Sequence, residues 1–226
     1  MDAKESKTVD ALSRPLPERL YRAAQALLAL ARDPNQLERV FEIGEALNSR
    51  ALPRILDAMA ADPAVKRLLD ERPAIDTKHV DFAALAALPD GTLGREYVRF
   101  LETNGINPDV FPKPNVADPR VSFVMQRIRQ THDLWHVLTG YTPDVGGEIV
   151  LQAFTFAQLR APSALMIALM GAVRHGRKER HLGRRMLDGY RRGKKTRSLA
   201  TFYWEDHWQD PLDALRVDLA CPPAAA

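Results

Sequence analysis

Two histidines four residues apart, His132 and His136, constrain this chain more than any other feature of its sequence. In an α-helix each residue turns by about 100°, so side chains four apart stand on one face, one turn from each other. Asp133 lies three residues before His136 and borders the same face. Two imidazoles and a carboxylate within one turn are the arrangement by which a single helix binds a transition metal. The stretch therefore predicts a helix that carries a metal site.

The segment after the histidines predicts a further metal ligand on a second helix. Gly140 and Pro143 end the first helix, because glycine suits the residue past a helix C-terminus and proline cannot continue the hydrogen-bond ladder. Gly146 and Gly147 are expected to complete a flexible turn in which the chain reverses. Glu148 opens the next apolar run and can return a carboxylate to the first helix. The pattern is H-D-x-x-H, eleven residues and then Glu, and it places the site between two adjacent helices.

The residues of this motif, taken alone, are compatible with more than one role. An isolated pair of histidines four apart is more often a core or surface pair than a metal site. Two carboxylates beside two imidazoles, however, are difficult to bury unless a cation compensates their charge. Asp133 keeps two interpretations, a direct ligand or a hydrogen-bond partner that orients a histidine. The other histidines have no partner at ligand spacing, so structural or solvated roles are expected for His79, His175, His181 and His207.

The length of 226 residues suits one domain with a substantial core. We expect residues 1–16 to be a disordered lead-in, residues 17–220 to form a single helical domain and residues 221–226 to be a tail. The single cysteine, Cys221, excludes an internal disulfide and fits a reducing compartment. The first residues lack an apolar segment and mix acids with lysines, so neither a secretory signal nor a strong organelle presequence is expected. A bacterial cytoplasmic protein is the simplest expectation.

Apolar residues at three-and-four spacing predict an all-α fold, and no run alternates with the period of two that marks strands. The first helix is expected over residues 18–32, and Asn35 can cap the second. Their apolar stripes are Leu20, Ala24, Leu27, Leu28 and Ala31 in the first helix, and Leu37, Val40, Phe41, Ile43 and Leu47 in the second. Helical patterns continue over residues 52–69 and 94–103. Residues 164–173 are apolar on every side, which predicts a fully buried helix or a surface that touches lipid.

Residues 174–197 form a strongly basic segment, with 11 Lys or Arg against two acids in a chain whose net charge is +3. Leu182, Met186 and Tyr190 recur every four residues within it and give an apolar stripe flanked by arginines. This is the profile of a helix on an anionic membrane surface, and equally of a packed helix with a solvated face. Nucleic acid is not expected as a partner, because only Tyr190 is interleaved with the basic residues and a stacking platform is missing.

The motif and its surroundings resemble the coenzyme Q biosynthesis protein 4 family of the ubiquinone pathway in mitochondria and bacteria. H-D-x-x-H followed after eleven residues by Glu is the signature of that family. The segments LPDGTLGREYVRFLETNGINPD, RIRQTHD and GEIVLQAFTFAQLRAP are similar to its flanking patterns, and FYWEDHWQDPLDALRVDL resembles its closing pattern. Within the closing pattern, Trp204 and Glu205 are expected to be structural contacts for the last helix. The resemblance runs from about Leu20 to about Leu219.

The resemblance implies a divalent metal held by four residues that would also be catalytic: His132, Asp133, His136 and Glu148. Zinc is the metal usually described for the family, although zinc cannot change its oxidation state. Iron or another transition metal is an alternative, since iron held by two histidines and a carboxylate could also activate dioxygen. The implied reaction is oxidative decarboxylation at ring carbon C1 of a polyprenylated 4-hydroxybenzoate, which replaces the carboxylate with a hydroxyl on the way to ubiquinone. The implied enzyme is a lyase of the 4-hydroxy-3-methoxy-5-polyprenylbenzoate decarboxylase type.

Three polar residues near the motif are candidates for substrate contacts. Arg127 and Arg129 either form salt bridges within the scaffold or meet a carboxylate or phosphate of the substrate. Gln152 lies four residues after Glu148 on the same helix face, where many members of the resembled family carry lysine. An apolar lining for a prenyl tail is plausible, although an ordinary core would have the same composition, from Phe154, Phe156, Leu165, Met166 and Met170.

The implied partners are a polyprenylated benzoate or quinone intermediate, other ubiquinone biosynthesis enzymes and an anionic membrane surface, to which a bacterial cytoplasmic protein would attach peripherally. A homodimer is also compatible with the sequence. One alternative is a non-catalytic scaffold that binds the prenyl lipid and organises the biosynthetic complex, with a structural metal. Another takes Asp133 as the counterpart of the glutamate in H-E-x-x-H hydrolases, but aspartate is one methylene shorter and reaches a metal-bound water less easily.

Overall fold

The structure, a computed structural model, describes residues 14–32, 36–48, 51–61 and 63–224. It confirms the all-α fold, because the described residues form helices and a single isolated bridge between Thr92 and Pro211. The described helices are α1 (Leu16–Arg32), α2 (Leu37–Leu47), α3 (Ala51–Ala61), α4 (Pro63–Glu71), α5 (Phe82–Ala86), α6 (Leu93–Asn104), α7 (Pro119–Thr139), α8 (Val145–Leu159), α9 (Pro162–His175), α10 (Leu182–Lys195), the 3-10 helix η3 (Trp204–His207) and α11 (Leu212–Asp218).

The predicted helices over residues 18–32 and 94–103 are confirmed as α1 and α6. The pattern over residues 52–69 is divided between α3 and α4, and Pro63 opens α4, where proline is tolerated because the first helical amide needs no partner. Asn35 and most of the expected lead-in lie outside the described residues. The domain boundaries given by the sequence stay predictions.

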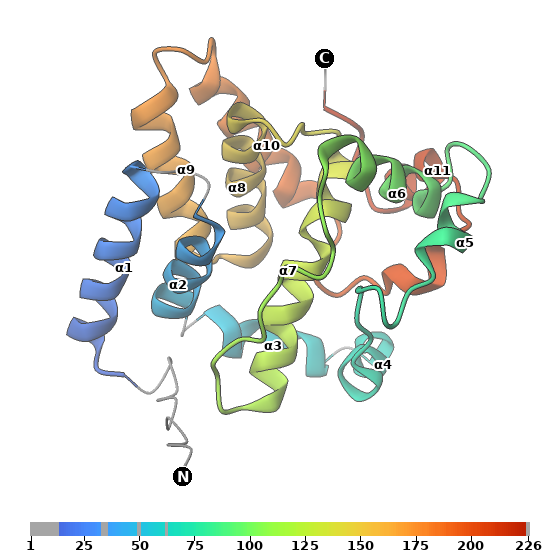
Figure 1. Cartoon of the computed structure of the whole chain (residues 1–226), viewed down its shortest axis with the longest axis horizontal. Helices are drawn as coiled ribbons and strands as arrows, with labels where there is room; N and C mark the ends of the chain where they lie inside the picture. The colour runs from blue at the N-terminus through green and yellow to red at the C-terminus, as the bar shows by residue number, and fades with distance from the viewer. Residues whose placement is uncertain (1–13, 33–35, 49–50, 62, 225–226) are drawn as a thin grey trace, which may run out of the picture.

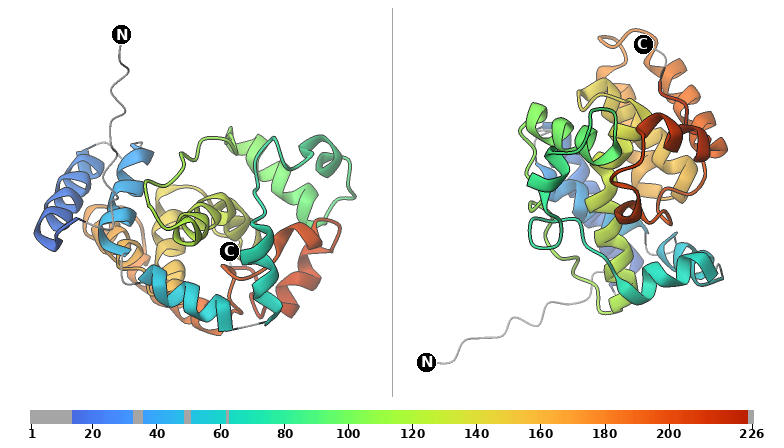
Figure 2. Two further views of the ribbon diagram at one scale, coloured as in Figure 1. Left: turned by 90° about the horizontal axis from the view of Figure 1, so that it is seen from below. Right: turned by 90° about the vertical axis from the view of Figure 1, so that its right-hand side faces the viewer.

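Helix α7 runs through the middle of the molecule, and α3, α6 and α11 pack against it (Figure 1). Helix α8 contacts both α9 and α10, α2 packs on α9, and α1 packs on α2. As a result α1 and α9 lie side by side at one edge, as both Figure 1 and Figure 2 show. The elements from α5 to α6 and from η3 to α11 lie at the opposite edge.

Helix α7 is fixed at both ends by local interactions. The carboxylate of Asp118 accepts hydrogen bonds from the first backbone amides, and Gly140 ends the helix with φ of +75°, as the glycine signal predicted. The side chain of Arg216 donates to the carbonyls of Val137 and Leu138, both at 3.0 Å. These bonds satisfy carbonyls of the last turn that have no partner within the helix. The helix that carries both histidines is therefore held firmly at its C-terminal end.

Helix α9 is not fully buried, so that prediction is wrong. Met166, Leu169 and Val173 are 37%, 49% and 87% exposed, whereas Ala164 and Ala168 are buried. The helix is apolar all round, but its described neighbours α2, α8 and α10 leave its outer side uncovered. The other interpretation of this segment, a surface that touches lipid, is compatible with the exposed side chains.

Part of the apolar stripe predicted for α1 faces outward and not toward the core. Leu20 and Leu28 are 50% and 61% exposed, whereas Ala23 and Ala26 are buried. Because α1 packs on α2, the small Ala23 and Ala26 lie on its inner face, whereas Leu20 and Leu28 lie on its outer face. The side chain of Ala31 lies outside the described residues.

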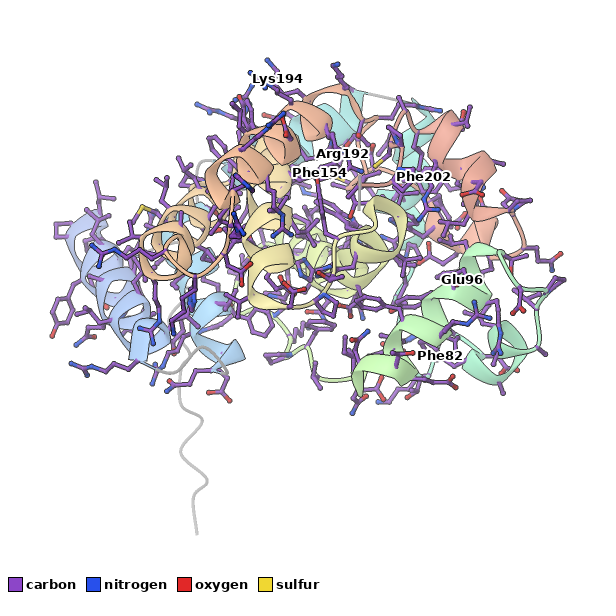
Figure 3. The ribbon with its side chains drawn as sticks, turned by 90° about the horizontal axis from the view of Figure 1, so that it is seen from above. Phe82, Glu96, Phe154, Arg192, Lys194 and Phe202 are labelled. Atoms are coloured by element: carbon purple, nitrogen blue, oxygen red, sulfur yellow. The ribbon has the colours of Figure 1, made fainter. Side chains whose placement is uncertain are left out.

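Helix α10 uses its apolar stripe to pack on α8. Leu182 is buried, and Gly189 and Gly193 let the two helices approach closely. In Figure 3, Lys194 of α10 points away from the molecule, while Phe154 of α8 points into it. The packed helix with a solvated basic face is thus the interpretation that the structure supports, and the stripe is not free to enter a membrane.

The close approach of α8 and α10 gives a direct stability test. A Cβ atom on Gly193 would lie 2.7 Å from the carbonyl oxygen of Phe154 and 2.9 Å from the Cβ of Ala157. We expect Gly193→Ala to lower the free energy of unfolding by about 1 to 3 kcal/mol through overpacking. Gly183→Ala in the same helix is the control, because no atom lies within 4 Å of its Cβ position. Urea denaturation that gives equal stabilities for the two variants would contradict this packing.

Candidate metal centre

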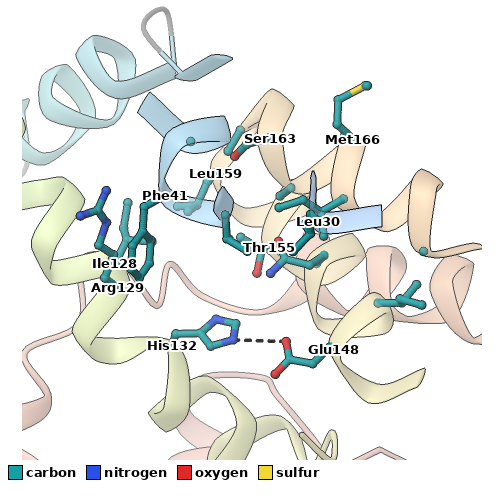
Figure 4. A pocket seen from close by; sticks show the side chains of 18 of the residues that line it. Leu30, Phe41, Ile128, Arg129, His132, Glu148, Thr155, Leu159, Ser163 and Met166 are labelled. Atoms are coloured by element: carbon teal, nitrogen blue, oxygen red, sulfur yellow. Dashed lines mark ion pairs between the residues drawn. The ribbon is translucent and has the colours of Figure 1, made fainter. Parts of the chain in front are cut away.

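Helices α7 and α8 bring His132, His136 and Glu148 together. One nitrogen of each histidine and one carboxylate oxygen of Glu148 all lie within 4.8 Å of one another. The Oε1 atom of Glu148 lies 3.0 Å from Nε2 of His136, and its Oε2 atom lies 3.4 Å from Nε2 of His132. Figure 4 shows the contact between His132 and Glu148. Each carboxylate oxygen thus faces one imidazole, and this group of three residues is the candidate metal centre.

The position of Glu148 depends on how α8 begins. Asp144 caps this helix by accepting a hydrogen bond from the amide of Gly147 at 2.9 Å. The helix therefore starts at Val145, and the glycine pair lies in its first turn; the prediction of a flexible glycine turn is wrong. A Cβ atom on Gly147 would lie only 2.0 Å from the carbonyl oxygen of Thr142. Glycine is required there for close approach of the returning chain, which presents Glu148 to α7.

The second ring nitrogen of His136 determines how its Nε2 atom behaves. His136 is 2% exposed, and its Nδ1 atom lies 2.9 Å from the carbonyl oxygen of Tyr141. Since a carbonyl only accepts, Nδ1 must carry a proton. In the neutral ring, Nε2 therefore presents a lone pair to a Glu148 oxygen 3.0 Å away. Two acceptors at this distance require a cation between them, either a proton on the ring or a metal ion, so the residues fit a metal site.

The electrostatics of the group agree with a shared cation. Burial alone would raise the pKa of Glu148, but the adjacent His132 and His136 outweigh burial and hold the pKa well below its usual range. Burial alone would lower the pKa of His132, but Glu148 and then Asp133 raise it above its ordinary value. Glu148 therefore stays ionised, and a divalent ion can displace the proton from His132.

Asp133 does not join the group of three. It is 6% exposed, and its Oδ2 atom is buried without a hydrogen-bond partner in the structure. Burial is the main reason why the pKa of Asp133 is raised, although His132 and His136 oppose the shift. A role for Asp133 as a fourth ligand stays a prediction.

Arg127 has a structural partner. It is 1% exposed and forms a two-armed ion pair with Glu205, whose Oε2 lies 2.7 Å from Nη2. It does not line the pocket beside the metal centre. The salt-bridged interpretation of Arg127 is therefore the one that the structure supports, and its partner Glu205 contacts α7.

Arg129 and Gln152, in contrast, both line this pocket. The guanidinium group of Arg129 donates to Glu45 at 3.0 Å and to the carbonyl of Pro112 at 2.9 Å, and it lies over the ring of Phe41. Burial is the main cause that lowers the pKa of Arg129. Arg129 thus links α7 to α2, and whether it also contacts a substrate stays a prediction, as it does for Gln152.

The pocket has a volume of about 970 Å³ and lies between α2, α3, α7, α8 and α9. His132, Asp133 and Glu148 line it together with many apolar side chains (Figure 4). Of the residues expected to line a prenyl site, Met166 and Met170 do so. The other three are not part of the lining: Phe154, which is buried in the core, Phe156, which stacks on Tyr190, and Leu165.

Several functional contacts have no signal in the sequence. The apolar wall contributed by α2 and α3 includes Phe41, Leu52 and Ile55, which come to line one pocket with residues of α9 only in the folded chain. The carbonyl of Tyr141 belongs to the backbone, which carries no residue-specific pattern. Phe100 of α6 stacks on His136 with ring centroids 5.4 Å apart.

Comparisons with known proteins identify a family that matches most of the chain. Residues 13–224 match the family described as Coenzyme Q (ubiquinone) biosynthesis protein Coq4. The chain is 35% identical over 214 residues to the mitochondrial ubiquinone biosynthesis protein COQ4 homolog of Homo sapiens, covering 92% of this chain and 80% of that protein. The corresponding protein of Xenopus tropicalis is 34% identical over 206 residues, which cover 90% of this chain and 73% of that protein. The crystal structure of a protein from Nostoc punctiforme, titled as a ubiquinone biosynthesis protein, is similar, with a TM-score of 0.73 and 30% sequence identity. The match covers 90% of this chain and 96% of the Nostoc chain.

Metal loading tests the assignment of the three ligands. We expect the purified protein to hold about one divalent ion per chain, measured by elemental analysis after dialysis. His136→Ala and Glu148→Ala should each weaken binding by more than about a hundredfold, because each removes one of the clustered donors. His79→Ala is the matched control, since His79 is exposed and paired with Asp76. Unchanged loading of both ligand variants would eliminate the site.

Proposed function

The chain belongs to the Coenzyme Q (ubiquinone) biosynthesis protein Coq4 family, and from this premise we propose that it is the metal-dependent oxidative decarboxylase of a polyprenylated 4-hydroxybenzoate intermediate. The family membership supports a place in ubiquinone biosynthesis. The proposed reaction breaks the bond between ring carbon C1 and the carboxyl group, releases carbon dioxide and forms a carbon–oxygen bond at C1. The net change at C1 is an oxidation and requires an oxidant such as dioxygen.

One observation carries the proposal: the histidine–glutamate group opens into a large, mainly apolar pocket. A prenylated hydroxybenzoate combines an acidic ring with a long apolar tail. The ring oxygens suit the polar wall at His132 and Glu148, and the tail suits the apolar walls contributed by α2, α3 and α9. No other described cluster of three His, Cys, Asp or Glu side chains has its donor atoms this close.

The substrate's own chemistry supports oxidation at C1. The phenol lies para to C1, so its ionised form pushes electron density onto the carbon that must be oxidised. In the proposal His132, His136 and Glu148 hold a divalent ion, which when bound supplies Lewis acidity toward the phenolate or carboxylate oxygen. The carbonyl of Tyr141 keeps the proton of His136 on Nδ1, so that Nε2 remains available as a ligand. The buried Asp133 borders the pocket, where its carboxyl group can orient the ring.

A second function, a non-catalytic scaffold for prenyl lipids, is favoured by the size of the pocket. About 970 Å³ of largely apolar space would bind a prenyl tail whether or not the metal acts in catalysis. A hydrolase of the H-E-x-x-H kind is less well supported, because Asp133 is buried and stands outside the group of donor atoms. Other enzymes of ubiquinone biosynthesis are proposed as partners in either case.

We further propose a bacterial cytoplasmic location with peripheral attachment to an anionic membrane. In the part of the chain that the structure describes, no helix has the length and apolar character needed to cross a bilayer. The named relatives from Homo sapiens and Xenopus tropicalis are mitochondrial. A prenylated substrate is dissolved in the bilayer, so a membrane-attached enzyme has direct access to it.

Release of carbon dioxide tests the proposed reaction. We expect metal-loaded protein, supplied with prenylated hydroxybenzoate labelled at the carboxyl carbon, to release labelled carbon dioxide in air. Glu148→Ala should lower the rate by more than about a hundredfold, while His79→Ala leaves it unchanged. If no labelled carbon dioxide is released in air although the substrate binds tightly, the decarboxylase function is rejected and the scaffold function is supported. Turnover of a peptide or phosphoester would instead revive the hydrolase.

A further inference from the structure

Helices α1 and α9 carry an exposed apolar surface, and three of its residues, Met166, Leu169 and Val173, also line the pocket beside the metal centre. We call it the α1–α9 face, and its residues are Leu20, Tyr21, Leu28, Met166, Leu169 and Val173. Their exposure ranges from 37% to 87%. Single exposed leucines are common on protein surfaces, but a cluster of large apolar side chains on two neighbouring helices marks an interaction surface.

The α1–α9 face borders the pocket of the candidate metal centre. Leu30 of α1 and Leu169 and Val173 of α9 line that pocket, and α1 and α9 lie side by side in Figures 1 and 2. Exposed residues among the lining mark where the pocket meets the molecular surface. A ligand that enters between α1 and α9 would therefore pass across the exposed apolar side chains.

Positive charge gathers at the end of the face. Helix α9 leads directly from Val173 into a segment with exposed Arg177, Lys178 and Arg180. The acidic residue within this segment, Glu179, is paired with Arg185, whose Nη1 atom lies 3.7 Å from its Oε2 atom. On α1 the nearby Glu18 is already paired with Arg14 and Arg22. The charge beside the face thus complements an anionic surface.

We propose that the α1–α9 face docks on an anionic phospholipid bilayer. Its leucine and valine side chains enter the boundary between headgroups and acyl chains, while Arg177, Lys178 and Arg180 contact lipid phosphates. The docked pocket opens toward the bilayer, so a prenylated substrate can pass into it without crossing water; this consequence rests on the proposed function. The docking surface differs from the stripe on α10 that the sequence suggested, because that stripe is packed on α8.

Vesicle flotation with the full chain tests the surface. Wild-type protein should float with phosphatidylcholine vesicles that contain phosphatidylglycerol, and less with vesicles of phosphatidylcholine alone. Val173→Glu, and separately the double variant Leu20→Glu and Leu28→Glu, should each lower partitioning by about tenfold or more. Val217→Glu is the matched control, because Val217 is 81% exposed and belongs to α11, which lies at the opposite edge of the molecule (Figure 1).

The contribution of the basic residues is tested separately, by binding to anionic and neutral vesicles at different salt concentrations. Arg177→Glu combined with Lys178→Glu should weaken binding to the anionic vesicles and remove most of its salt dependence, with little effect on neutral vesicles. Wild-type partitioning of the Leu20→Glu and Leu28→Glu double variant would overturn the proposal, as would an equal loss for Val217→Glu. If the double variant converts a dimer into monomers and still floats, a second copy occupies the face and the proposal fails.

A second measurement separates this surface from the proposed function. The side chains of Leu20 and Leu28 do not line the pocket, so the double variant should bind detergent-solubilised prenylated hydroxybenzoate as wild type does. Retained substrate binding with unchanged flotation rejects the docking surface and leaves the function intact. Flotation through the face by a wild-type protein that cannot bind the substrate rejects the function and leaves the docking surface intact.

Discussion

The contact of one carboxylate with two imidazoles is the interaction on which the site depends. Glu148 places one oxygen 3.0 Å from His136 and the other 3.4 Å from His132. Because the carbonyl of Tyr141 occupies the Nδ1 proton of His136, the carboxylate and Nε2 are two acceptors that only a cation can hold together. Either a proton on the ring or a metal ion can supply this cation, and a divalent ion can take the place of the proton.

The surrounding fold fixes this contact from both sides. The C-terminal turn of α7 is secured by Arg216, and the pair between Arg127 and Glu205 anchors its middle in the core. On the other side, the cap at Asp144 and the close approach at Gly147 determine where α8 begins. Because both helices are fixed in this way, His132, His136 and Glu148 keep their relative positions beside the pocket.

Local periodicity determines how much of the molecule the sequence could predict. Helical spacing sets which side chains share a face, so the helices and the meeting of His132, His136 and Glu148 followed from residue order and a reversal of the chain. The exposure of α9 and the outward leucines of α1 did not follow, because distant helices decide which face is covered. The prediction of a turn at Gly146 and Gly147 was wrong for a related reason. Glycine occurs both in turns and at close backbone contacts, and Gly147 makes such a contact inside a capped helix. A backbone carbonyl such as that of Tyr141 has no signal in the sequence.

Crystallographic localisation of the bound ion tests the central claim most directly. Anomalous diffraction from metal-loaded crystals should place one ion about 2.0 to 2.2 Å from Nε2 of His132, Nε2 of His136 and a carboxylate oxygen of Glu148, with Nδ1 of His136 still bonded to the carbonyl of Tyr141. An ion bound elsewhere, or the three side chains in direct contact with no ion at saturating metal, would contradict the account.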